Sequence, residues 1–554
     1  MHLEPTGAWC LLRICAVLVV FLLFAAHLIK LKKNVPLFYC WLGAIAVLGG
    51  AAAFFLPIAV NSGFAKEDDG AALRQAILYT TGGLLGVITL GETHRKNNQE
   101  KEKNENDHTR QVYAERRSRY TTAVEQLANE KAPVRLGGIY TLVGLVDEWL
   151  ADDSLKPEER KKEGQVIINN LCSYIRSPFP LAEKREVLEK DHVPDDYNDD
   201  FTADQAQLRG EQDVRRAIFE EMRKRSSTFT KDKKGDVFKT APGIWSDFDF
   251  DFNRAPIFYP LNNLTIEKGN FSSAKFYSVA NFSEAIFSEA KFSEAKFTGN
   301  AHFLGTEFTG AADFGGAEFT GNAHFRNAKF TRGAGFKNVK FTRYTDFRKA
   351  KFTRGADFRN AEFTGYAGFS KAEFTENADF RNAEFAGNAH FWNAKFTRGA
   401  GFSKAKFTGN ADFGGAEFTG AGYFGGVKFT GNADFGGTEF TEKAHFKGAE
   451  FTRIADFGDA KFTGITYFGG AKFTRSTSFS GAYFEKSAPI FADTSGPARF
   501  SAQVAQKDYV FSPVKPGSKS IARGTATLDG KSLKIPLGAV LFNPSSGKTS
   551  KPAQ

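Results

Sequence analysis

Cysteine is scarce in this chain of 554 residues. There are four, Cys10, Cys15, Cys40 and Cys172. The first three lie in apolar segments and the fourth stands alone, so the sequence has neither a disulfide framework nor the paired spacing of a metal site. A low cysteine content of this kind fits a reducing compartment.

Common catalytic and nucleotide-binding motifs are missing as well. The sequence has no H-E-x-x-H, no C-x-x-C and no Ser/His/Asp arrangement. One G-x-G-x-x-G match, at 420–425, lies inside a repeat with no helix after it. The S-G-K-T stretch at 546–549 has Phe542 where a phosphate loop needs glycine. We therefore expect a non-enzymatic protein without a cofactor.

Phenylalanine, in contrast, is abundant, with 59 residues, most of them in a repeat between Phe271 and Phe491. From Phe297 to Phe484 the spacing alternates between six and five residues, which gives seventeen units of eleven residues with two Phe each. A fixed short period is typical of stacked repeat architectures. A small residue stands two positions before most Phe, with a polar residue between them, and this period of two predicts short strands with Phe inside. A helix would place Phe residues five apart on different faces.

The repeat resembles the pentapeptide-repeat family, whose units have the form A-x-[L/F]-x-x. A readable copy is Ala416-Glu417-Phe418-Thr419-Gly420. The resemblance implies a right-handed, four-sided parallel β-helix with one unit per face. Because alternate units carry one extra residue, we expect about 22 residues per coil. A flattened coil of eleven residues is the alternative, and it would stack Phe319 on Phe330 and not on Phe341.

A threonine follows the first Phe in sixteen of the seventeen units, and Ala386 is the exception. Threonine at such a regular position suits a β edge or corner, where its hydroxyl can bond the backbone.

Three apolar stretches, 11–29, 37–60 and 73–91, precede the repeat and are candidate membrane spans. The third is short, so two spans are an alternative. Lysines directly after the first stretch disfavour a cleaved signal peptide. Basic residues in the loop at 30–36 and after residue 92 place both on the cytoplasmic side. We expect a multi-pass integral protein of a bacterial inner membrane with its repeat in the cytoplasm.

The segment between the spans and the repeat predicts helices. It resembles the corresponding part of bacterial membrane-anchored pentapeptide-repeat proteins, in Glu125-Gln126-Leu127 and in the V-R-L-G-G-I-Y-T-L stretch at 134–142. The expected organisation is a transmembrane anchor at 1–92, a charged helical stalk or linker at 93–120, a helical domain at 121–228, a connector and N-terminal cap at 229–260, the repeat at 261–491, a C-terminal cap at 492–544 and a disordered tail at 545–554.

The net charge of +10 favours an anionic partner. Residues 326–360 hold eleven basic and two acidic residues, a net charge of +9. We name these eleven the basic belt: Arg326, Lys329, Arg332, Lys337, Lys340, Arg343, Arg348, Lys349, Lys351, Arg354 and Arg359. An ordinary solvated surface is the alternative interpretation. Trp392 replaces a polar residue at a corner and is a candidate anchor for a partner.

Steps of 22 residues bring a second set of polar residues into one column. They are His302, His324, Asp346, His390 and Asp412, with Gly368 between Asp346 and His390. If the coil has 22 residues, they point outward about 4.8 Å apart. A solvated ladder with pairs such as His390 and Asp412 is the main interpretation, and a metal site is the alternative.

These patterns predict a rigid, membrane-tethered surface for an unknown protein partner, and they allow a homo-oligomer. One alternative is binding of nucleic acid or acidic lipid through the basic belt. Another, implied by the best-known members of the family, is DNA mimicry directed at topoisomerase, which the net positive charge disfavours.

Overall fold

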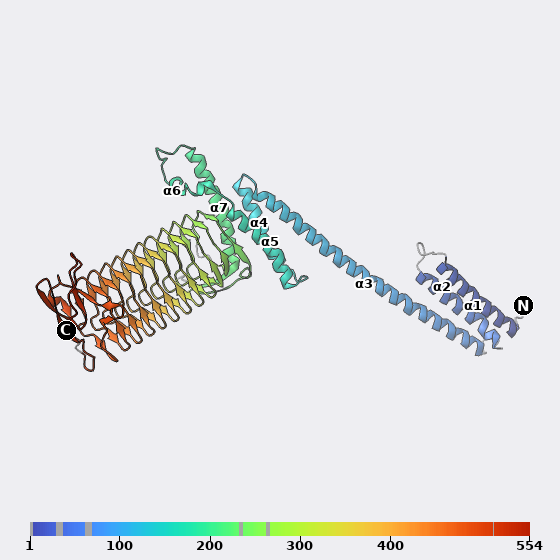
Figure 1. Cartoon of the computed structure of the whole chain (residues 1–554). Helices are drawn as coiled ribbons and strands as arrows, with labels where there is room; N and C mark the ends of the chain where they lie inside the picture. Colours follow the sequence, from blue (N-terminus) through green and yellow to red (C-terminus); the bar gives the residue numbers. More distant parts are fainter. Residues whose placement is uncertain (1–3, 29–36, 61–68, 232–236, 262–265, 513–514) are drawn as a thin grey trace. The chain divides into compact units, whose positions relative to one another are not determined.

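The computed structural model describes residues 4–28, 37–60, 69–231, 237–261, 266–512 and 515–554 (Figure 1). The chain divides into two compact units, Met1–Arg117 and Ser118–Gln554. Each unit is described by itself below.

The first unit contains α1 (Pro5–Leu28), α2 (Leu37–Ala59) and most of α3 (Asp69–Leu127). Each of the three helices contains a stretch that is long and apolar enough to cross a membrane. Their large apolar side chains are turned outward, and Phe21 is 65 % and Val87 70 % exposed. A surface of this kind suits lipid better than water. The predicted third span and the predicted stalk form one helix of 59 residues, about 88 Å long at 1.5 Å per residue (Figure 1).

Close packing of α2 and α3 depends on Gly49. A Cβ atom at this position would lie 2.2 Å from Cγ2 of Thr81 and 2.9 Å from its Cβ, so the helices would have to move apart. We expect Gly49→Ala to lower the stability of the helical bundle by about 1–3 kcal/mol. The measurement is the unfolding temperature of the full chain in detergent. Gly50→Ala is the matched control, because nothing lies within 4 Å of its added Cβ. An equal loss in both variants would contradict the packing argument.

The helical domain of the second unit follows α3. It consists of α4 (Ala132–Leu150), α5 (Pro157–Arg176), the 3-10 turn η2 (Pro180–Ala182), α6 (Arg185–Leu188) and α7 (Phe201–Ser226). Proline stands in the first turn of both α4 and α5, where its missing N–H costs nothing. The predicted apolar face of α4 is buried, including Ile139, Leu142 and Val146. An antiparallel pair, β1 (Ser227–Lys231) and β2 (Val237–Pro242), comes next.

The repeat forms a parallel β-solenoid with four faces, each a sheet of short strands. Face 1 runs from β4 (Pro256–Ile257) to β51 (Val540–Phe542), face 2 from β7 (Ala280–Asn281) to β48 (Tyr509–Val510), face 3 from β8 (Ile286–Phe287) to β44 (Tyr483–Phe484) and face 4 from β3 (Asp249–Asp251) to β41 (Thr466–Tyr467). One coil takes one strand from each face, for example β18 (Lys340–Phe341), β19 (Thr345–Asp346), β20 (Lys351–Phe352) and β21 (Ala356–Asp357).

The coil has 22 residues, as predicted. Phe319 pairs in register with Phe341, and their rings stack with centroids 4.9 Å apart. The eleven-residue alternative, which required Phe330 in that place, is wrong. Small residues share the interior with the rings, and Ala323 and Phe325 are both fully buried.

The threonine position behaves as the sequence predicts. The hydroxyl of Thr298 donates to the carbonyl of Phe276 at 3.0 Å, and the hydroxyl of Thr452 donates to that of Phe429 at 2.7 Å. Each of these bonds joins a coil to the one before it. The threonines therefore stabilise the stacking from outside while the rings stabilise it from inside.

The two ends of the solenoid are covered. At the first coil, Nη1 of Arg176 in α5 donates to the carbonyl and to Oδ2 of Asp251, both at 2.7 Å. At the last, β49 (Arg523–Leu528) and β50 (Lys531–Pro536) form a hairpin, and β51 pairs with β47 (Arg499–Ser501). Covering the ends in this way protects strand edges that could otherwise pair with another chain.

The prediction of a disordered tail at 545–554 is wrong. Ala553 is 2 % exposed, its N–H donates to the carbonyl of Ala539 at 2.8 Å, and the carbonyl of Gln554 accepts from the N–H of Thr525 at 2.9 Å. These bonds are made by the backbone. The polar side chains of residues 545–554 therefore gave no indication of these backbone hydrogen bonds.

Candidate interaction surfaces

Faces 1 and 3 carry a mixture of lysine and glutamate side chains, many of which pair between coils. On face 1, Lys406 lies 2.5 Å from Glu384, and on face 3, Lys461 lies 2.7 Å from Glu439. Exposed pairs of this kind contribute little to stability. They do make both faces flat, solvated and of mixed charge.

The basic belt surrounds the solenoid and does not form a patch. Five of its members have acidic partners, namely Arg326 and Arg348 on Asp346, Lys329 on Glu307, Lys351 on Glu373 and Arg359 on Asp357. Within the described ranges the other six make no ion pair: Arg332, Lys337, Lys340, Arg343, Lys349 and Arg354. Arg332 and Arg354 precede strands of face 4, whereas Arg343 lies between faces 1 and 2, at the opposite corner. A flat anionic surface therefore cannot reach all three together.

The predicted column on face 2 exists, but its residues pair with one another. The rings of His302 and His324 stack 5.0 Å apart, and Nδ1 of His390 lies 3.2 Å from Oδ2 of Asp412. Asp346 was expected to point into solvent, yet its side chain is fully buried. In the part of the chain that the structure describes, no group of three or more His, Cys, Asp or Glu residues is placed to hold a metal ion.

Two arginines hold Asp346 in its buried position. Nη2 of Arg348 lies 2.7 Å from Oδ2, and Nε of Arg326 lies 3.2 Å from it. Burial alone would raise the pKa of this carboxyl, but the hydrogen bonds from Arg348 and then Arg326 outweigh it and lower the pKa below its ordinary value. Ionised Asp346 therefore stabilises the fold above its unfolded pKa of about 3.9, and this contribution is lost as the pH falls through the lower folded value.

We expect Asp346→Asn to destabilise the solenoid by about 1–3 kcal/mol at neutral pH, since it leaves two arginines without their carboxylate. The difference from the unmodified chain should shrink as the pH falls below about 4. Urea unfolding of both chains at pH 7 and at pH 3 measures this difference in the free energy of unfolding.

Asp434, on the same face, is the matched control. Burial, and then the neighbouring charges of Asp412 and Asp456, raise its pKa, against the opposing bond from the N–H of Gly436. Asp434→Asn should therefore be neutral or stabilising at pH 7. A similar loss in both variants would contradict the assignment of the Asp346 effect to its arginines.

Trp392 is 45 % exposed on the surface, and Nζ of Lys371 lies 5.0 Å from the centroid of its ring. One face of the ring is therefore already used by a cation. Its role as an anchor for a partner stays a prediction.

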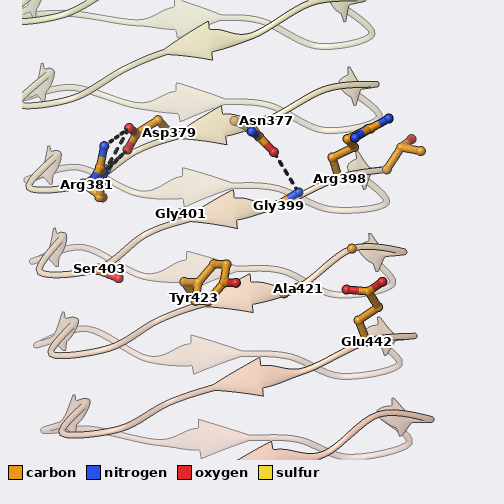
Figure 2. Close-up of a pocket in the computed structure, with 13 residues that line it drawn as sticks. Asn377, Asp379, Arg381, Arg398, Gly399, Gly401, Ser403, Ala421, Tyr423 and Glu442 are labelled. Atoms are coloured by element: carbon orange, nitrogen blue, oxygen red, sulfur yellow. Dashed lines mark hydrogen bonds and ion pairs between the residues drawn. The ribbon is translucent and has the colours of Figure 1, made fainter.

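A hollow of about 820 Å³ on face 4 was not foreseen from the sequence (Figure 2). It lies over β29 (Ala400–Gly401), where Gly399 and Gly401 have no side chain, and Gly420 and Ala421 extend it in the next coil. Asp379, Arg381, Arg398, Tyr423 and Glu442 border it (Figure 2). The cluster of glycines was the available signal.

Residues 271–489 match a sequence model described as pentapeptide repeats (9 copies), in the overlapping segments 271–318, 314–362, 358–406, 402–449 and 446–489. This segment belongs to the pentapeptide-repeat family. Pentapeptide-repeat solenoids are in general structural and non-catalytic. No curated protein and no solved structure matches the chain. The match begins after the helical segments, so the resemblance to the membrane-anchored bacterial type stays a prediction.

Proposed function

We propose that this protein is a membrane-tethered, non-enzymatic scaffold whose pentapeptide-repeat solenoid offers a rigid surface to a protein partner. The observation that carries the proposal is the combination of three long apolar helices and a solenoid in one chain. The outward apolar side chains of the first unit support insertion into lipid. The basic residues at 30–36 and after 92 support a cytoplasmic solenoid at a bacterial inner membrane.

The polar part of α3 suits a spacer between membrane and solenoid. From residue 92 to 111 its side chains are polar all round, and exposed ion pairs lie along it, such as Arg95 with Glu92 at 3.0 Å and Lys101 with Glu105 at 3.9 Å. A helix without an apolar stripe does not form a coiled coil. Pairs three or four residues apart support it as a single helix.

Site-specific crosslinking in intact cells tests the scaffold. A photoreactive residue is placed in the full chain on each of the four faces in turn, and at Asn98 in α3 as the control. We expect a reproducible adduct with a defined protein from at least one face and none from Asn98. Adducts from none of the faces would contradict the proposal.

A protease added outside the cells should leave residues 93–554 intact, and digestion of the solenoid would reverse the orientation.

Binding of an anionic polymer is a second candidate, favoured by the six belt residues without an acidic partner. Because these six are spread around the solenoid, five of them between strands, we expect contacts with phosphates only, which counterion release makes salt-dependent. The full chain should bind DNA at about 20 mM salt, and this binding should disappear near 150 mM salt. Replacing Arg332, Arg343 and Arg354 together by Glu should weaken the low-salt binding at least about tenfold.

The control for this prediction replaces Lys329, Lys351 and Arg359 by Glu, because these three belt residues already have acidic partners at the surface and their replacement should therefore weaken the binding less. DNA binding that persists at physiological salt would support a nucleic-acid function over a protein scaffold. DNA mimicry stays the least favoured alternative, since the strands of faces 1 and 3 present lysine more often than glutamate and the net charge is +10.

A further inference from the structure

The corner between faces 2 and 3 changes the sign of its charge along the solenoid. In each coil this corner runs from the outward residue of a face 2 strand to that of the next face 3 strand, as from Asp346 of β19 to Lys351 of β20. Six basic and two acidic residues lie there in three successive coils, at 324–329, 346–351 and 368–373. Six acidic residues and one basic residue lie there in three later coils, at 412–417, 434–439 and 456–461. We name these two stretches the basic half and the acidic half.

The opposite corner, between faces 4 and 1, shows no such change. Four basic and four acidic residues lie there at 335–340, 357–362 and 379–384. Four basic residues and one acidic residue lie there at 401–406, 423–428 and 445–450. The change of sign is therefore a property of one corner and not of the repeat. A surface with opposite charges at its two ends is complementary to a copy of itself turned end for end.

The two halves also differ in bulk. The two residues after the buried Phe form the turn of each coil, and in the basic half they include Lys349 and Lys371, both exposed. In the acidic half five of these six turn positions are glycine, as at Gly437. Trp392 lies in the coil between the halves, and a Cβ atom at Gly414 would lie 3.4 Å from Cδ1 of its ring. The corner therefore has long side chains at one end, bare backbone at the other and an exposed aromatic ring between them.

Each half keeps charge that the chain itself does not neutralise. Among the described residues, Lys349 and Lys371 of the basic half make no ion pair. Asp434 and Asp456 of the acidic half make none either, and Oδ1 of each accepts the N–H of the residue two positions later. Burial, and with it the charges of Asp412 and Asp456, raises the pKa of Asp434. An ammonium group beside these carboxylates would offset their mutual repulsion.

We propose that two copies of this chain associate through this corner, side by side and antiparallel. A two-fold axis between the coil of Trp392 and the next coil sets the register. Lys371 then faces Asp434 of the second copy. One coil further out, Lys349 faces Asp456 of the second copy. The symmetry repeats both contacts and brings the two Trp392 side chains together at the centre, where interfaces are enriched in aromatic residues. This dimer goes beyond the proposed scaffold function and does not depend on it.

Crosslinking of the full chain in detergent tests this arrangement. Asn393→Cys places a thiol next to the axis, and a short bismaleimide should join two such chains at about 20 mM salt. Asn382→Cys is the matched control, because Asn382 holds the same turn position at the opposite corner, with φ of 58° against 53°. We expect at least about fivefold more dimer from Asn393→Cys, and a loss of this excess at about 500 mM salt, because salt screens exposed charges. Equal yields, or no dimer from Asn393→Cys, would overturn the proposal.

Charge variants of the Asn393→Cys chain test the register. Lys349→Glu together with Lys371→Glu should lower the dimer yield at least about tenfold, because carboxylates would then face carboxylates. Adding Asp434→Lys and Asp456→Lys should restore the yield, since both contacts return with their signs exchanged. A chain with all four changes that resists protease like the unmodified solenoid, yet gives no dimer, would contradict the register and with it the proposal.

Gly437→Lys tests the bare acidic half without removing a charge. The backbone accepts lysine there, because Lys349 and Lys371 hold the equivalent position with φ of 58° and Gly437 has φ of 64°. The added side chain would face Lys371 of the second copy, so the dimer yield should fall at least about tenfold. Gly426→Lys, at the opposite corner and with the same φ of 64°, is the control and should leave the yield unchanged. An unchanged yield from the Gly437→Lys chain would also overturn the proposal.

Discussion

Replacing Arg215 by methionine should lower the stability of the second unit by about 3–5 kcal/mol. Arg215 lies in α7 with 1 % of its surface exposed. Its Nε donates to Oε1 of Glu211 at 2.7 Å, and its Nη1 and Nη2 donate to the carbonyls of Ile175 and Ser177 at 2.8 and 3.0 Å. Methionine fills a similar volume but leaves these acceptors unsatisfied, which is the costly part of such a change.

The same side chain joins the helical domain to the first coil. The guanidinium lies 5.8 Å from the ring of Phe179 and 5.4 Å from that of Phe258, and these two rings stack 4.9 Å apart. It also lies 5.6 Å from Tyr174. Burial, and then Glu211, raise the pKa of Tyr174 to about 12, so its phenol stays protonated and donates to Glu211. Loss of Arg215 should therefore expose the edge of the first coil.

Urea unfolding of the full chain measures the loss of stability, and limited proteolysis between α7 and β3 measures the exposure. Arg216→Met is the matched control. The neighbouring Arg216 is 41 % exposed, and its one ion pair is long, with Nη1 3.6 Å from Oδ1 of Asp213. It should change stability by no more than about 0.5 kcal/mol. Equal effects of the two variants would show that the buried contacts of Arg215 do not stabilise the cap.

Replacing Phe380 by alanine should also cost about 3–5 kcal/mol. The ring is fully buried and stacks on Phe358 and Phe402, both at 4.8 Å. It meets Phe369 and Phe391 edge to face, both at 5.5 Å. Removal takes away the buried apolar area and these ring contacts together, and the neighbouring rings cannot close the cavity without leaving their own stacks.

Because each coil contacts only its neighbours, the damage should be local. We expect new protease cleavage within the coils next to Phe380 before the whole solenoid unfolds. Trp392→Ala, a surface aromatic, should change stability by no more than about 0.5 kcal/mol. An unchanged unfolding curve together with unchanged proteolysis of the Phe380→Ala chain would contradict the prediction.

The sequence alone determined the coil and the faces of the solenoid. The alternation of five and six residues between Phe positions sets the number of residues that return the chain to the same column, and Phe319 lies under Phe341 as that count requires. The apolar stretches likewise determined where α1 and α2 lie. In both cases a local pattern repeats many times or runs long, so one physical requirement, burial of apolar surface, decides the outcome.

Only the tertiary structure decided which polar side chains are free. Asp346 and Asp412 occupy the same column, yet one is buried between two arginines and the other pairs with His390. The hollow arises because Gly401 lies between Asp379 and Tyr423, three residues that are each 22 apart in the sequence. Such contacts depend on side chains from three coils at once, and each coil alone has the same repeat pattern. The period fixed the stacking of the coils, whereas their individual residues decided where the surface is paired and where it is open.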